Sequence, residues 1–147
     1  MNDKIQILSS ELNRAIIKYR GAYSAWAKSH GISYNKMLVI FTAMENGFCT
    51  QKNICESYLL PKQTINHVFV TMINDGELIE YPEKNVGKEK AYRLTEKGIE
   101  ITTPLLNSVR TIEERAALNM GLKKLEQLNE LITEYGNFLA GALEELN

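Results

Sequence analysis

The chain has 147 residues, of which 44% are hydrophobic and 24% are charged, and its formal net charge is −1. These values are ordinary for a globular protein and leave room for one domain with its own core. No apolar run approaches the roughly 20 residues that a membrane span requires, and the N-terminus lacks the apolar core of a signal peptide. We therefore expect a cytoplasmic protein that does not bind membranes.

Charge is distributed unevenly along the chain. Residues 1–30 carry a net charge of +3, residues 47–98 balance seven basic against seven acidic side chains, and residues 99–147 carry −4. The C-terminal part is therefore poorly suited to contact phosphate. Any affinity for nucleic acid has to come from local placement of side chains in the middle segment, doubled by dimerisation.

Two helices are expected before residue 47. Apolar side chains recur at spacings of three and four over residues 3–29, and a helix this apolar has to pack on a partner subunit or on the C-terminal helices. The stripe comprises Ile5, Leu8, Leu12, Ala15, Tyr19, Tyr23 and Trp26. Ser33 can cap a second helix that stops at Asn46-Gly47, and Phe48-Cys49 would then be a short link.

The segment Thr50–Gly76 predicts two short helices joined by a tight turn. Thr50 is a candidate N-cap, and Pro61 can open the second helix because its φ is already helical and its missing amide hydrogen is not needed there. The inward residues would be Ile54, Cys55 and Tyr58, then Ile65, Val68, Phe69, Met72 and Ile73. Gly76 follows as a left-handed cap residue. Polar side chains off that stripe crowd the first two turns of the second helix, as reading of a DNA major groove requires.

After Gly76 the pattern changes to two short strands. Residues 78–81 and 90–94 read as strands, and residues 82–88 read as a polar loop that carries lysines. A β-hairpin placed directly after such a helix pair predicts a winged helix, in which the loop reaches phosphates or the minor groove.

The C-terminal third predicts two more helices. Thr95 can cap a helix over residues 96–119, in which Thr102-Thr103-Pro104 predicts a bend or a fresh start because proline removes one helical hydrogen bond. Gly121 separates it from a last helix with leucines at near-heptad spacing. We expect one mainly α domain over 1–147: dimerisation helices at 1–30 and 99–147, and a winged helix-turn-helix at 31–98 with its wing at about 78–94.

Four stretches of the sequence resemble the MarR family of bacterial transcription regulators. They are Cys49–Cys55, Leu60–Asn66, Met72–Ile79 and Leu94–Gly98, and the order of elements fits over nearly the whole chain. The resemblance implies an obligate homodimer with two winged helices that read a pseudo-palindromic operator. It also implies that a ligand or an oxidation event changes the spacing of the two winged helices. A repressor is the expected role.

The candidate DNA contacts fall into three sets. The first set lies at the start of the second helix and would touch bases or phosphates: Lys62, Gln63, Thr64, Asn66 and His67. Within it, Lys62 and His67 would contact phosphate, although His67 can equally be a plain surface residue. Thr50, Gln51 and Asn53 would position the DNA backbone. Lys84, Lys88 and Lys90 would serve the wing.

The wing departs from the family pattern. The family usually carries Asp-x-Arg before the Leu-Thr pair, with the arginine in the minor groove, whereas this chain reads Asn-Val-Gly-Lys-Glu-Lys over residues 85–90. Lys88 can replace the arginine as a charge but not as a planar fork. We therefore expect contact with phosphate instead of minor-groove reading.

Six residues define an aromatic group with two interpretations: Tyr19, Tyr23, Trp26, His30, Tyr34 and Phe41. They could line a pocket for a small aromatic or apolar effector, or they could form core and dimer interface, which we favour. Cys49 and Cys55 fit buried apolar positions better than a redox pair.

Nothing in the sequence indicates catalysis. The histidines are His30 and His67 alone, and no catalytic triad, metalloprotease motif, phosphate loop or CxxC motif occurs. We expect no enzyme, cofactor or metal. Two other functions stay open, a winged-helix module that binds protein and a carrier of small aromatic ligands.

Overall fold

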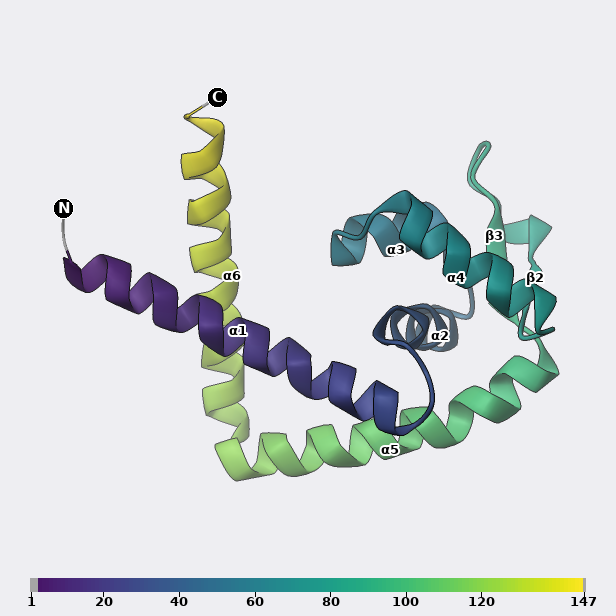
Figure 1. Cartoon of the computed structure of the whole chain (residues 1–147), viewed down its shortest axis with the longest axis horizontal. Coiled ribbons are helices and arrows are strands. Elements are labelled where there is room, and N and C mark those ends of the chain that lie inside the picture. Colours follow the sequence, from purple (N-terminus) through teal and green to yellow (C-terminus); the bar gives the residue numbers. More distant parts are fainter. Residues whose placement is uncertain (1–2, 147) are drawn as a thin grey trace. The chain divides into compact units, whose positions relative to one another are not determined.

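The computed structural model describes residues 3–146 and is mainly helical (Figure 1). Helices α1 (Asp3–Ser29) and α2 (Tyr34–Asn46) precede strand β1 (Cys49–Thr50) and helices α3 (Gln51–Tyr58) and α4 (Lys62–Asn74). Strand β2 (Leu78–Glu80), the 3-10 turn η1 (Pro82–Lys84) and strand β3 (Ala91–Leu94) follow. Helices α5 (Glu96–Met120) and α6 (Leu122–Glu144) complete the described chain. The predicted mainly α winged-helix fold is confirmed.

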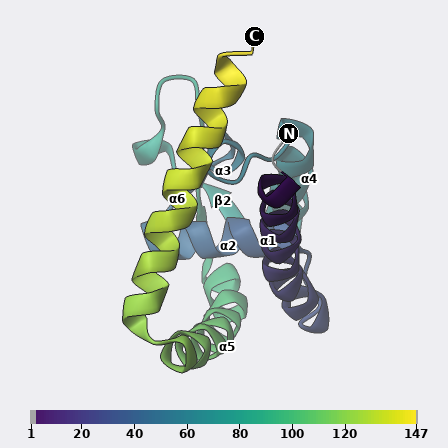
Figure 2. The same ribbon diagram turned by 90° about the vertical axis from the view of Figure 1, so that its left-hand side faces the viewer.

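Two compact units divide the chain, with the boundary inside α5. The first runs to Leu105 and holds α1 to α4, the sheet and the start of α5, while the second runs from Leu106. Figure 2 shows α6 as one uninterrupted helix. No helix among residues 3–146 is both long and apolar enough to cross a membrane.

Hydroxyl side chains begin three of the helices, as the sequence predicts. Ser33 Oγ accepts from Lys36 N at 3.0 Å, and Thr50 Oγ1 accepts from Asn53 N at 3.0 Å. Thr95 Oγ1 likewise accepts from Gly98 N at 3.0 Å. Each hydroxyl satisfies an amide that the first helical turn leaves without an intrahelical partner.

The sheet is antiparallel, with the order β1-β3-β2. Cys49 pairs with Tyr92, and Leu78 pairs with Leu94. β3 is therefore the central strand, and the hairpin loop projects beyond it (Figure 1). The predicted Phe48-Cys49 link is wrong in part, because Cys49–Thr50 forms β1. Two residues are too few to show the alternation by which strands are recognised.

Buried residues of the first unit form two clusters. The larger joins α2, α3, α4 and the sheet around Phe69, whose ring meets the Tyr92 ring edge-on at 5.2 Å. The smaller centres on Ala27, Met37 and Leu38, between α1 and α2. Leu60, in the turn between α3 and α4, packs against both clusters. This turn is therefore tied directly to the α1–α2 contact.

Three helix predictions need correction. α4 begins at Lys62 with Pro61 as its N-cap, because the Pro61 carbonyl accepts from Ile65 N at 3.3 Å. α5 runs unbroken through Pro104, so no fresh helix starts there. One missing amide does not stop a helix whose other turns remain bonded. Tyr58 and Ile73 are 38% and 40% exposed and thus lie at the edge of the stripes predicted to be buried.

Candidate nucleic-acid interface

The first two turns of α4 present polar side chains to solvent. Ile65 and Phe69 are fully buried and fix the rotation of the helix. Lys62, Gln63, Asn66 and His67 are therefore exposed, and Thr64 is half-buried. Four of the five predicted contacts therefore lie on the outer side of the first two turns, and Thr64 lies at the edge of the buried face.

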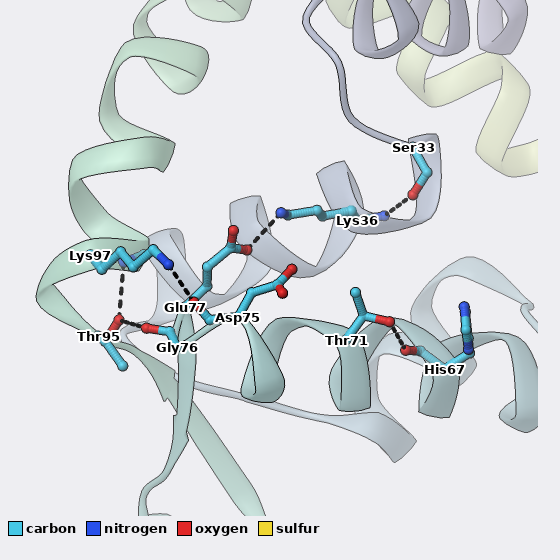
Figure 3. Close-up of polar contacts among 10 residues, drawn as sticks. Ser33, Lys36, His67, Thr71, Asp75, Gly76, Glu77, Thr95 and Lys97 are labelled. Carbon is cyan, nitrogen blue, oxygen red and sulfur yellow. Dashed lines mark hydrogen bonds and ion pairs between the residues drawn. The ribbon is translucent and has the colours of Figure 1, made fainter.

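The end of α4 is held by polar contacts to α2 and α5 (Figure 3). Gly76, with φ 72°, ends the helix in a Schellman motif: Gly76 N donates to Ile73 O at 3.0 Å and Glu77 N to Met72 O at 2.9 Å. Thr95 Oγ1 donates to Gly76 O at 2.6 Å, and Lys97 Nζ donates to Asp75 O at 2.5 Å. The start of α5 thereby fixes the end of α4.

An ion pair adds α2 to this junction. Lys36 Nζ lies 2.6 Å from Glu77 Oε2, and the two side chains are only 21% and 9% exposed (Figure 3). Gly98 packs so closely on the Glu77 carbonyl that a Cβ at that position would overlap it. Sequence patterns gave no sign of this ion pair, because its partners lie on elements far apart in the chain.

The start of α3 lies beside the start of α4. Gln51 Nε2 donates to Asn66 Oδ1 at 3.1 Å, so two predicted contacts orient each other. Asn53 is exposed, whereas Thr50 is buried and uses its hydroxyl as the N-cap. Thr50 therefore acts through the position of α3, and its own side chain does not face solvent.

The three wing lysines have different surroundings. Lys90 Nζ lies 2.8 Å from Glu80 Oε1, and this hydrogen bond raises the pKa of Lys90. Lys84 Nζ lies 5.7 Å from the centre of the Phe48 ring. Lys88 is exposed in the tight turn Val86–Glu89, where Gly87 has φ 59°. Lys88 forms no ion pair within the described part of the chain, so it is the lysine best placed to meet a phosphate.

The aromatic group is brought together in part. Trp26 stacks on His30 with ring centres 4.4 Å apart and lies 6.0 Å from Phe41, which joins α1 to α2. The ring centres of Tyr19 and Tyr23 lie 5.4 Å apart, but Tyr19 is 63% exposed. The remaining member, Tyr34, lies under the Arg20 guanidinium. A surface hollow on α6, lined by residues such as Asn129 and Phe138, includes none of the six.

The cysteines and histidines form no reactive cluster. Burial raises the pKa of Cys49 to about 12, and it also raises the pKa of Cys55. Both thiols are therefore protonated at neutral pH, which disfavours reaction with oxidants. Over residues 3–146, no three His, Cys, Asp or Glu side chains gather in a way that could hold a metal.

Sequence comparison alone does not place the chain. No family model matches it, and no curated protein matches it. Similarity is found in the fold.

Solved structures of similar fold are consistently MarR family regulators. A MarR family regulator from Neisseria meningitidis matches with a TM-score of 0.84 and 23% identity over 100% of both chains. NadR in complex with 4-hydroxyphenylacetate matches with a TM-score of 0.72 and 16% identity over 84% of this chain and 91% of NadR. The PcaV transcriptional regulator from Streptomyces coelicolor, in complex with its natural ligand, matches with a TM-score of 0.68 and 14% identity over 88% and 94% of the two chains. The chain thus has the winged-helix fold of the MarR family regulators.

Proposed function

We propose that the chain is a cytoplasmic transcription regulator, a repressor, that binds a pseudo-palindromic DNA operator as a homodimer. The observation that carries this proposal is the exposed polar surface on the first two turns of α4, opposite the buried face of the same helix. The fold adds support, because its neighbours are regulators and not enzymes.

The contacts follow from the chemistry of each side chain. Gln63 and Asn66 offer amide groups that can pair with adenine in the major groove, and Thr64 can meet a thymine methyl group. Lys62, His67 and Lys88 would contact phosphates and carry little sequence information. Gln51 would hold Asn66 in position through their 3.1 Å hydrogen bond.

Dimerisation would come from residues 1–30 and 99–147. Large apolar side chains are exposed on α1, among them Ile7 and Ile17, and on α6, among them Leu131 and Phe138. Exposed apolar faces of this extent are typical of protein interfaces. A second copy of the chain would cover them and bring a second α4 to the operator.

A small aromatic or apolar molecule would release the DNA. The contact between Trp26 and Phe41 adjoins the smaller cluster, which reaches the turn between α3 and α4 through Leu60. A ligand that repacked this cluster would therefore shift the start of α4. The ligand-bound structures of NadR and PcaV support this part of the proposal.

Selection of bound fragments from random duplex DNA tests the function. The expected outcome is a two-fold symmetric site whose half-sites are about one helical turn apart, with binding that weakens steeply as salt rises. A protein-binding module or a ligand carrier would enrich no sequence. Small aromatic acids added to the bound complex would then test release, with thermal shift as the independent measure of ligand binding.

A further inference from the structure

Glu89 connects the wing to the first turn of α3. Lys52 N donates to Glu89 Oε1 at 3.0 Å, although 37 positions separate the two residues in sequence. The neighbouring amide of Asn53 is already occupied by Thr50 Oγ1. A carboxylate from the wing thus accepts a hydrogen bond from an amide at the N-terminal end of α3, where the helix dipole attracts anions.

The same carboxylate lies beside the candidate DNA contacts. Glu89 and Lys62 both act on the Cys55 thiol, where burial is the largest cause of a raised pKa, Glu89 raises it further and Lys62 lowers it. Glu89 is half-buried, whereas Lys88 next to it is exposed. A negative charge is therefore fixed in the turn at the tip of the wing, against the first turn of α3.

One of the three wing lysines is already paired with another carboxylate. Lys90 is paired with Glu80 at 2.8 Å, and Lys84 lies over the Phe48 ring. A phosphate approaching the α3 amides would meet the Glu89 carboxylate at the position it would itself occupy, because both anions seek the same donors.

We propose that Glu89 is an internal substitute for a DNA phosphate, which docks the wing on α3 and lowers the affinity of the chain for all duplexes alike. This inference rests on the proposed function. The ratio of operator affinity to non-specific affinity is unchanged, because the carboxylate acts on the phosphate backbone that every duplex shares.

The substitution Glu89→Gln tests the charge while keeping an oxygen that can accept from Lys52 N. We expect the affinity for a random duplex and for the selected operator to rise by the same factor, about threefold to tenfold, with a steeper dependence on salt. Glu83→Gln is the matched control, because Glu83 is an exposed wing carboxylate in η1 with no contact to α3 within the described residues.

Two outcomes overturn the proposal. One is an equal rise for both variants, which would reflect net charge alone. The other is an unchanged or lower affinity for Glu89→Gln. If neither the wild type nor any variant bound duplex DNA, the proposed function would be overturned. The role of Glu89 as a substitute for phosphate would then fall with it.

Cys55 provides a readout that needs no DNA. Glu89→Gln should lower the pKa of the Cys55 thiol and speed its alkylation by iodoacetamide at fixed pH, whereas Glu83→Gln should leave the rate unchanged. Cys49, with a pKa of about 12, stays unreactive in the folded protein and checks that each variant is folded. An unchanged Cys55 rate in Glu89→Gln would place the carboxylate away from α3 and overturn the proposal.

Discussion

At the scale of single residues, the proposed function assigns base reading and phosphate contact to different side chains. Asn66 is exposed on α4 and is oriented by Gln51, which leaves its amide nitrogen for a base edge. Lys88 is exposed in the turn at the tip of the wing. Substitution of these two residues should therefore affect DNA binding in different ways.

Asn66→Ala should relax sequence preference and cost about 1–3 kcal/mol on the selected operator, with little change on random duplex. Lys88→Ala should weaken all duplexes alike and reduce the slope of log affinity against log salt by about one. Fluorescence anisotropy at several salt concentrations measures both effects. Asn74→Ala, at the exposed far end of α4, is the control that should change neither. A Lys88→Ala variant with altered base preference would contradict the assignment to phosphate.

At the scale of elements, the position of α4 depends on its C-terminal end. Glu77 is buried and pairs with Lys36 of α2, while the backbone beside it accepts hydrogen bonds from Thr95 and Lys97 at the start of α5. A buried carboxylate needs its partner, because neither charge is well solvated there.

Glu77→Gln should destabilise the fold by about 2 kcal/mol, since it leaves Lys36 without its counter-charge in a largely buried site. The midpoint of urea unfolding measures the loss, with an unchanged slope showing that the unfolded state is not altered. Glu80→Gln removes an ion pair of similar length at the exposed Lys90 and should change the midpoint little. Equal effects of the two substitutions would argue against a special role for the buried junction.

Elements differ in how far their sequence predicts them. The caps at Ser33, Thr50 and Thr95 and the stop at Gly76 are local signals, and the structure confirms all four. The pairing of β1 with β3 and the bond from Lys52 to Glu89 join residues far apart in the chain. Such contacts depend on the tertiary fold, so the periodicity of one sequence carries no sign of them. The contact of Glu89 with α3 is not predictable from the sequence for this reason.

At the scale of the whole molecule, the proposed dimer has to account for the apolar surface of the terminal helices. Ile17 and Phe138 are 69% and 70% exposed, which is costly for large side chains that no partner covers. The net charge of −4 over residues 99–147 makes this part poorly suited to contact phosphate.

Phe138→Glu should convert the dimer to a monomer and abolish high-affinity operator binding, because a single α4 reads only one half-site. Sedimentation velocity measures the mass, and the melting temperature should lose its dependence on protein concentration. Gln127→Glu places the same charge at an exposed polar position of α6 and should leave the dimer intact. A Phe138→Glu variant that stays dimeric would move the interface off this face of α6.

The central position of β3 in the sheet affects how the protein unfolds locally. β1 precedes α3, β2 follows α4, and both strands pair with β3. The segment that carries α3 and α4 thus begins and ends in strands that pair with β3, so loss of β3 would free both of its ends. Amide hydrogen exchange should therefore release α3, α4 and β3 as one cooperative unit, whereas the wing turn at Val86–Glu89 exchanges early by itself. The surface proposed to read DNA would therefore fold and unfold as a whole.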